Sequence, residues 1–149
     1  MTFIAKTATP AAKSVLRQAT ALRPKRKTAS DGLLPSKAHI SQSPNSDHNT
    51  GLAVDLTHDP DNGINGHEIF DALKADVRVK YLIFKGVIWS KKDGDQRYTG
   101  SNAHNKHIHI SIKDICGNDT SPWFPWLGKP KVVQTIKAKV KPLPKKEAQ

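Results

Sequence analysis

The segment His104–Lys113, HNKHIHISIK, decides the fold that this sequence predicts. From His107 onward polar and apolar residues alternate, so that His107, His109 and Ser111 fall on one side and isoleucines on the other. Successive side chains of a β-strand point to opposite faces, and this pattern therefore predicts a strand with an apolar back and an imidazole-bearing front. Two such histidines either share a metal ion or simply face solvent, and a second sequence feature must decide between these readings.

That second feature is the segment Ser46–Thr57, SDHNTGLAVDLT. Its aliphatic residues alternate with other residues after Gly51, which predicts another strand with one apolar face. His48 precedes the turn at Gly51, and Asp55 lies on the polar face of the strand. Together with His109 they make a set of two histidines and one carboxylate, the kind of set that holds catalytic zinc and leaves one position to water. Iron(II) accepts the same ligand types, but zinc suits this spacing better.

These two segments resemble the zinc D-Ala-D-Ala carboxypeptidases and L-alanyl-D-glutamate endopeptidases of peptidoglycan. SDHNTGLAVD matches their SxHxxGxAxD motif, and His107–His109 matches the HxH that closes their metal site. The resemblance covers Ser30–Lys113 and extends to the compact peptidase domains of phage endolysins, whose fold is related to the Hedgehog signalling domain. It implies the zinc ligands His48, Asp55 and His109, and it implies a contact between Ser46 and the substrate.

The sequence departs from the family pattern at the catalytic acid. Many members have a glutamate or aspartate three residues before the last histidine ligand, where this chain has Lys106, and Hedgehog-type domains have a glutamate six residues before it, where this chain has Ala103. In lysostaphin-type relatives the first histidine of HxH assists catalysis, which points to His107 as the catalytic group. His104 is the second candidate.

The polar segment Ser90–Asn105 is expected to form the rim of the substrate cleft, with Arg97 and Tyr98 as substrate contacts. Asp93 and Asp95 are alternative candidates for the missing base. Both stand next to glycine in a DGD sequence that is typical of a turn, so a turn role is the preferred interpretation.

The other predicted elements are two helices and two strands. Thr9 before Pro10 indicates a helix over residues 10–22, and Asn65 is the expected N-cap of a helix that runs to about Ala75. The glycine of Lys85-Gly86 suits a tight hairpin turn between the strands Tyr81–Phe84 and Val87–Trp89. The predicted fold is α+β, a small antiparallel sheet with a zinc site on one face and helices on the other.

Three regions follow from this pattern: residues 1–29 with the first helix and a basic segment, residues 30–128 as the zinc peptidase domain, and residues 129–149 as a basic, proline-containing tail expected to be flexible. The aromatic cluster at residues 123–126 is expected to cap the core, and stacking on sugar rings is the alternative. The basic run Arg23–Lys27 is expected to be a solvated charge run more than a nucleic-acid site.

Composition narrows the class of protein. The chain has 149 residues, enough for one domain, and a formal net charge of +11, which favours anionic partners. Its single cysteine, Cys116, excludes an intrachain disulfide and a thiolate metal cluster. No apolar run approaches the ~18 residues of a membrane span, and Lys6 interrupts the only N-terminal apolar stretch, so we expect no export signal.

The sequence therefore predicts a monomeric, zinc-dependent peptidase that hydrolyses an amide bond in the stem peptide of bacterial peptidoglycan. An endolysin of this kind would collect in the host cytoplasm and reach the cell wall at lysis. The alternative is a catalytically silent, Hedgehog-like zinc domain that only binds. A metal-dependent nuclease of the HNH kind is less favoured because no histidine follows His109; no nucleic-acid partner is expected.

Overall fold

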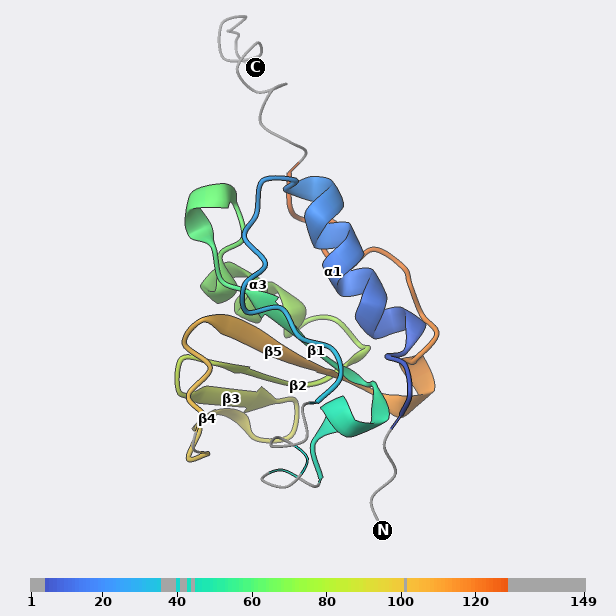
Figure 1. The fold of residues 1–149 in the computed structure, drawn as a ribbon. Helices are drawn as coiled ribbons and strands as arrows, with labels where there is room; N and C mark the ends of the chain where they lie inside the picture. The colour runs from blue at the N-terminus through green and yellow to red at the C-terminus, as the bar shows by residue number, and fades with distance from the viewer. Residues whose placement is uncertain (1–4, 36–39, 41–42, 44, 101, 129–149) are drawn as a thin grey trace, which may run out of the picture.

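The computed structural model describes residues 5–35, 40, 43, 45–100 and 102–128. Their centre is one antiparallel sheet of five strands with the order β1-β5-β2-β3-β4 (Figure 1). The strands are β1 (Ala53–Thr57), β2 (Val79–Phe84), β3 (Val87–Ser90), β4 (Gly94–Arg97) and β5 (His107–Ile112). The predicted α+β class with an antiparallel sheet is confirmed, and β5, the segment with the alternating histidines, lies between β1 and β2.

Two α-helices, α1 (Pro10–Leu22) and α3 (Gly66–Leu73), lie together on one side of the sheet (Figure 1). Three short 3-10 helices complete the described part: η1 (Asp47–Thr50), η2 (Pro60–Asn62) and η3 (Asp114–Cys116). α1 packs on β1, and α3 packs on β2 and β5. Among the described residues no helix is both long and apolar enough to cross a membrane.

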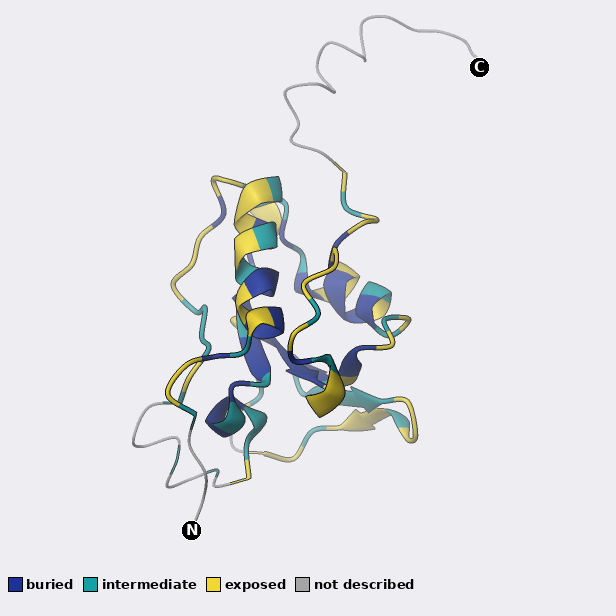
Figure 2. Cartoon of the chain, turned by 90° about the vertical axis from the view of Figure 1, so that its right-hand side faces the viewer, coloured by how far each residue is buried: buried dark blue, intermediate teal, exposed yellow. Residues whose placement is uncertain are grey.

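The alternation in β5 determines which face meets the helices. Ile108, Ile110 and Ile112 are buried in the core that α1 and α3 close, so the histidines between them point to the opposite face. Figure 2 shows the buried stretches gathered where the two helices and the strands meet. The sheet thus has an apolar face for the core and a polar face for a site.

Both predicted helix starts are confirmed. The Thr9 side chain accepts a hydrogen bond from the Ala12 amide, and the Asn65 side chain accepts one from the His67 amide. The predicted hairpin is also present: Lys85 and Gly86 have φ angles of 44° and 80°, as a tight turn between twisted strands requires.

Strand β4 has no counterpart among the predicted elements. It pairs with β3, opposite Val87–Ser90, and forms the sheet edge within Ser90–Asn105. Its sequence GDQR contains no apolar residue because an edge strand that is exposed on both sides buries none. A pattern of hydrophobicity therefore does not reveal it.

The aromatic segment caps the core, as the preferred interpretation predicted. Trp123 is 1% exposed, its Nε1–H donates to Ser14 Oγ at 2.8 Å, and the guanidinium carbon of Arg78 lies 3.5 Å from a Trp123 ring centroid. Phe124 is buried beside it, whereas Trp126 is partly exposed. The hydrogen bond between Trp123 and Ser14 thus links the C-terminal part of the described chain to α1.

The basic run differs from a uniformly solvated charge run. The Arg26 side chain is buried and forms a bidentate ion pair with Asp31, with distances of 3.0 and 2.7 Å. Arg26 therefore has a structural role near the start of the predicted peptidase region. Residues 129–149, the predicted tail, lie outside the described residues.

Candidate metal centre

The pairing of β1 with β5 places Asp55 directly opposite His109. Asp55 Oδ1 lies 3.2 Å from His109 Nδ1 and 3.1 Å from His48 Nε2. The three potential ligand atoms lie within 4.8 Å of one another, and the group can hold a metal ion. The structure therefore brings together the three residues that the sequence proposed as ligands.

The residues at the two ends of η1 fix the position of His48 beside the sheet. Ser46 caps η1 by accepting a hydrogen bond from the His48 amide, and Gly51 ends it with a φ of 74°. A Cβ atom at Gly51 would lie 2.9 Å from the Thr7 carbonyl oxygen, which explains why glycine stands there. This turn returns the chain into β1 with His48 facing Asp55.

The second nitrogen of each histidine has its own partner. His48 Nδ1 lies 2.8 Å from the Leu33 carbonyl oxygen, so it donates, and its Nε2 faces Asp55. His109 Nε2 lies 2.8 Å from Ser111 Oγ, and its Nδ1 faces Asp55. The Ser111 side chain also hydrogen-bonds with Tyr81. Such partners orient metal-binding imidazoles and fix their tautomers.

The electrostatics of the group favour a cation at its centre. Burial alone would raise the pKa of Asp55, but hydrogen bonds with His109 and His48 outweigh it and hold this pKa well below its usual range. Burial likewise opposes protonation of His48, and the neighbouring Asp55 raises the pKa of His48 above its ordinary value. The donor set of two imidazoles and one carboxylate, with its second nitrogens satisfied, fits a zinc ion.

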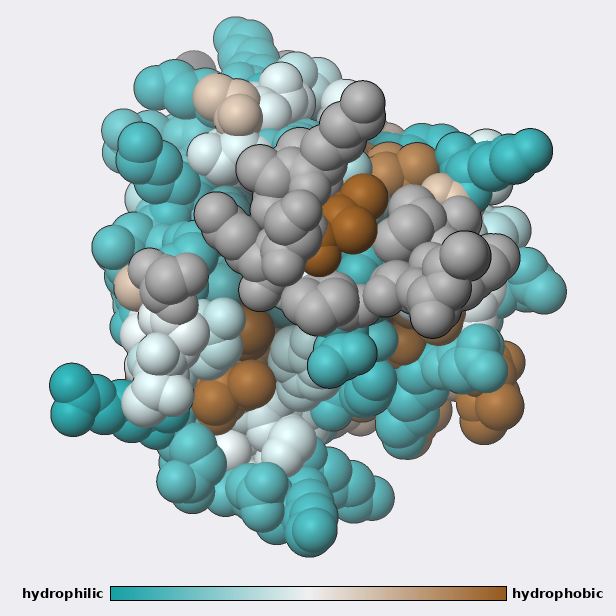
Figure 3. Space-filling view, turned by 60° about the horizontal axis from the view of Figure 1, so that its bottom comes forward, coloured by the Kyte–Doolittle hydropathy of each residue, from teal (hydrophilic) through white to brown (hydrophobic). Residues whose placement is uncertain are grey.

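The metal centre lies in the wall of a cavity of about 410 Å³. The described lining residues are Gly32, Leu34, Pro35, Ser43, Ser46, His48, Asp55, Tyr81, Ile83, Tyr98, Asn102, His104 and His109. Asp55 is the only carboxylate among them. In Figure 3, where the bottom of the view of Figure 1 comes forward, the described residues are mostly hydrophilic, with a few apolar side chains among them.

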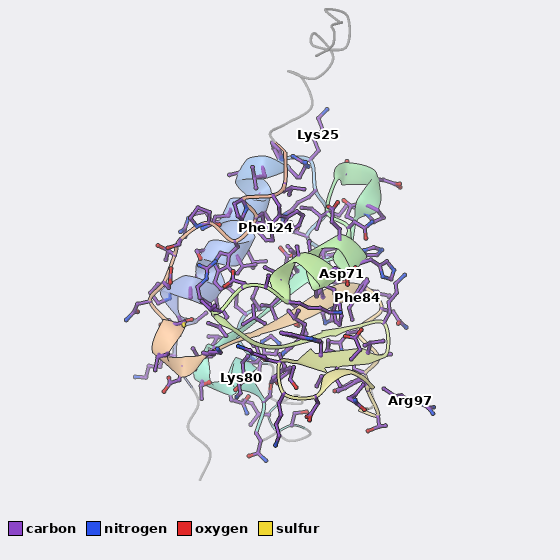
Figure 4. The ribbon with its side chains drawn as sticks, turned by 180° about the vertical axis from the view of Figure 1, so that it is seen from behind. Lys25, Asp71, Lys80, Phe84, Arg97 and Phe124 are labelled. Carbon is purple, nitrogen blue, oxygen red and sulfur yellow. The ribbon has the colours of Figure 1, made fainter. Side chains whose placement is uncertain are left out.

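Two of the three proposed substrate contacts, Ser46 and Tyr98, line this cavity. Arg97 does not belong to its described lining; it is exposed on β4, and Figure 4 shows its side chain extending outward from the molecule. The alternative bases Asp93 and Asp95 lie in the β3–β4 hairpin, where Asp95 forms an ion pair with Lys74 at 3.0 Å. Neither aspartate lines the cavity.

The two proposed catalytic histidines lie close to the candidate metal centre, with their ring centroids 5.1 Å apart. His107 Nε2 is 3.5 Å from Asp55 Oδ2, and the His104 ring centroid is 5.5 Å from that of His109. His104 lines the main cavity and adopts a φ of 60°, which is rare for a residue with a side chain. His104 Nδ1 and His107 Nε2 are buried and have no hydrogen-bond partner among the described residues.

Burial and the neighbouring histidines lower the pKa of His104 to about 4. Burial also lowers the pKa of His107, against the opposing effect of Asp55. Both shifts favour the neutral imidazole, and burial leaves the ring nitrogen atoms poorly solvated. Buried polar atoms without partners are uncommon and are found at functional sites.

Sequence reasoning did not identify Tyr81 and Asn102 as part of the site. Tyr81 stacks on His109 with ring centroids 5.5 Å apart and an interplanar angle of 16°, and it lines the cavity. Asn102 lines the same cavity, and its side chain accepts a hydrogen bond from the His104 amide. Leu82 and Phe84 take the core face of β2 and leave Tyr81 on the other face, but only the order of the strands places it beside His109.

No family model, no curated protein and no solved structure matches this chain.

Proposed function

We propose that this protein is a zinc-dependent peptidase that hydrolyses an amide bond in the stem peptide of bacterial peptidoglycan. The observation that carries the proposal is the group of His48, Asp55 and His109 in the wall of a cavity, with three ligand atoms within 4.8 Å. Catalytic zinc is commonly held by three nitrogen and oxygen ligands, whereas closed structural sites use four. The substrate class rests on the motif resemblance of Ser46–Asp55 and His107–His109.

A bound zinc ion would polarise the scissile carbonyl group and lower the pKa of a water molecule at the site. The chain's own residues provide the proton transfer, and His107 is the first candidate because its buried Nε2 has no described hydrogen-bond partner and lies beside Asp55. It would accept or donate a proton, or stabilise the negative charge on the carbonyl oxygen. His104, whose ring is 5.1 Å from that of His107, is the second candidate.

The peptide would be positioned by side chains of the cavity wall. Ser46 and Tyr98 line the cavity and are placed to contact it. Arg97, exposed at the sheet edge, would meet a part of the polymer that extends beyond the cavity. The formal charge of +11 suits capture on an anionic cell wall, in an interaction that salt weakens. A monomer that collects in the host cytoplasm and reaches the wall at lysis would suit this role.

One specific observation favours a second candidate, a metal domain that binds without catalysis. Asp55 is the only carboxylate among the described residues of the cavity wall, and its oxygen atoms face the two histidine ligands and His107. In that case a partner would occupy the cavity without being cleaved.

Incubation with purified peptidoglycan separates the two functions. We expect new free amines and carboxyl groups to appear with the zinc-loaded protein, to cease with a chelator, and to return when zinc is restored. Asp55→Asn should abolish the release. A folded, zinc-loaded protein that binds the wall but releases no new amine would reject the peptidase and favour the binding domain.

A further inference from the structure

A second cavity of about 380 Å³ lies beside the candidate metal centre, and the proposed function assigns no ligand to it. Its described lining residues are Ser30, Asp31, Asn102, Asn105, Lys106 and His107. Asn102 lines both cavities, so the two are neighbours. His107 forms part of its wall and lies 3.5 Å from Asp55. A ligand that occupies both cavities would thus pass the catalytic group.

The negative charge in this second cavity is already compensated. Both oxygens of Asp31 accept hydrogen bonds from Arg26, at 3.0 and 2.7 Å, and Oδ1 also accepts from the Thr57 hydroxyl at 2.7 Å. The Thr57 amide donates a further bond to Oδ1 at 3.0 Å. These structural hydrogen bonds therefore occupy the carboxylate oxygens of Asp31, which have little remaining capacity to bind a cationic ligand.

The positive charge is not compensated in this way. Lys106 is exposed and forms no ion pair with any residue that the structure describes, in contrast to Lys74 and Lys80, which pair with aspartates. The Asn102 carbonyl oxygen accepts from the His104 amide, which leaves its NH₂ group as a donor. Asn105 adds a second exposed amide. The residues that line the cavity thus carry one ammonium group without an ion pair and neutral amide donors, a combination that suits a carboxylate.

We propose that this second cavity is a subsite that binds a free carboxylate of the substrate peptide, and that Lys106 provides the charge that selects it. The identity of the ligand as a peptide rests on the proposed function. A glutamate that is linked through its side chain retains a free carboxylate close to its amide bonds, and a carboxamide at the same place would carry no charge. The subsite would therefore distinguish acidic from amidated stem peptides.

The test uses two synthetic stem tetrapeptides that differ only in D-isoglutamate or D-isoglutamine at the second residue. Titration calorimetry of the full chain without metal measures binding without turnover. We expect the acidic peptide to bind about 5-fold more tightly, as suits an ion pair at an exposed ammonium group. The preference should weaken as salt increases. Lys106→Gln should remove it, and Lys106→Arg should keep most of it.

Lys92→Gln is the matched control, because Lys92 is exposed in the β3–β4 turn and lines neither cavity. It should leave the preference unchanged. Equal binding of both peptides to the wild type, binding of neither, or a preference that survives Lys106→Gln would overturn the subsite. If the protein hydrolyses peptidoglycan but binds both peptides equally, the peptidase proposal stands and the subsite proposal fails. If the acidic peptide binds preferentially but no peptide bond is hydrolysed, the subsite proposal stands and the peptidase proposal fails.

Discussion

At the scale of single residues, the candidate metal centre depends on the ligand atoms of His48, Asp55 and His109, which lie within 4.8 Å of one another. We expect the purified protein to carry about one zinc ion per chain. His109→Ala should lose it, because two remaining ligands cannot close the site. Elemental analysis of dialysed protein gives the stoichiometry, and His67→Ala, an exposed histidine on α3, is the control that should keep the metal. Wild type without zinc, or full occupancy in His109→Ala, would refute the assignment.

Ser111 offers a finer test of the same centre. Its hydroxyl oxygen lies 2.8 Å from His109 Nε2, and once Nδ1 binds zinc it would accept from Nε2–H and hold the ring with Nδ1 toward Asp55. Ser111→Ala should weaken zinc binding by about 10- to 100-fold without removing a ligand, because partners of this kind fix the imidazole's orientation. Competition with a chromophoric chelator measures the change, and Ser90→Ala in the β3–β4 hairpin serves as the control. Unchanged affinity would mean that packing alone orients His109.

His107 carries the proposed catalytic role, and its substitution separates chemistry from metal binding. His107→Ala should keep the zinc ion and lose hydrolysis of peptidoglycan by about 10²- to 10⁴-fold, the usual contribution of a general acid–base group. Initial rates of amine release, together with the zinc content, provide the measurement. If His107→Ala keeps full activity, His104→Ala should show the loss instead. An active enzyme that tolerates both substitutions has no imidazole base at this site.

At the scale of elements, the contact between α1 and the C-terminal aromatic segment holds the core closed. Trp123 Nε1–H has Ser14 Oγ as its partner in a buried position. Ser14→Ala should therefore lower the free energy of unfolding by about 1–3 kcal/mol, the cost of a buried donor left unpaired. Urea denaturation measures the loss, and Lys13→Ala, its exposed neighbour, should have little effect. The zinc content should not change, because this contact lies on the opposite side of the sheet from the metal centre. A loss of zinc would show that α1 also positions the ligands.

At the scale of the whole molecule, the candidate ligands come from η1, β1 and β5, so a metal ion bound there would link segments that only the folded chain brings together. Zinc should stabilise the fold by mass action, by about 4 kcal/mol when its free concentration is 1,000 times its dissociation constant. Thermal denaturation with zinc and with a chelator measures this as a difference in melting temperature. The difference should vanish in His109→Ala. If zinc does not change the melting temperature of the wild type, a metal site formed by folding is contradicted.

The sequence by itself determined the strands β1 and β5, the hairpin turn at Lys85-Gly86, both helix starts and the three residues of the candidate metal centre. Each has a local signal, because a strand or helix with one buried face repeats at a fixed period, and caps and turns need particular residues. Tertiary structure alone decided the strand order, the edge strand β4, and the position of Tyr81 beside His109. It also decided the second cavity around Lys106. These features depend on which segments pair and on which charged side chains meet a partner in the folded chain. Contacts between residues far apart in the chain leave no periodic pattern in the sequence.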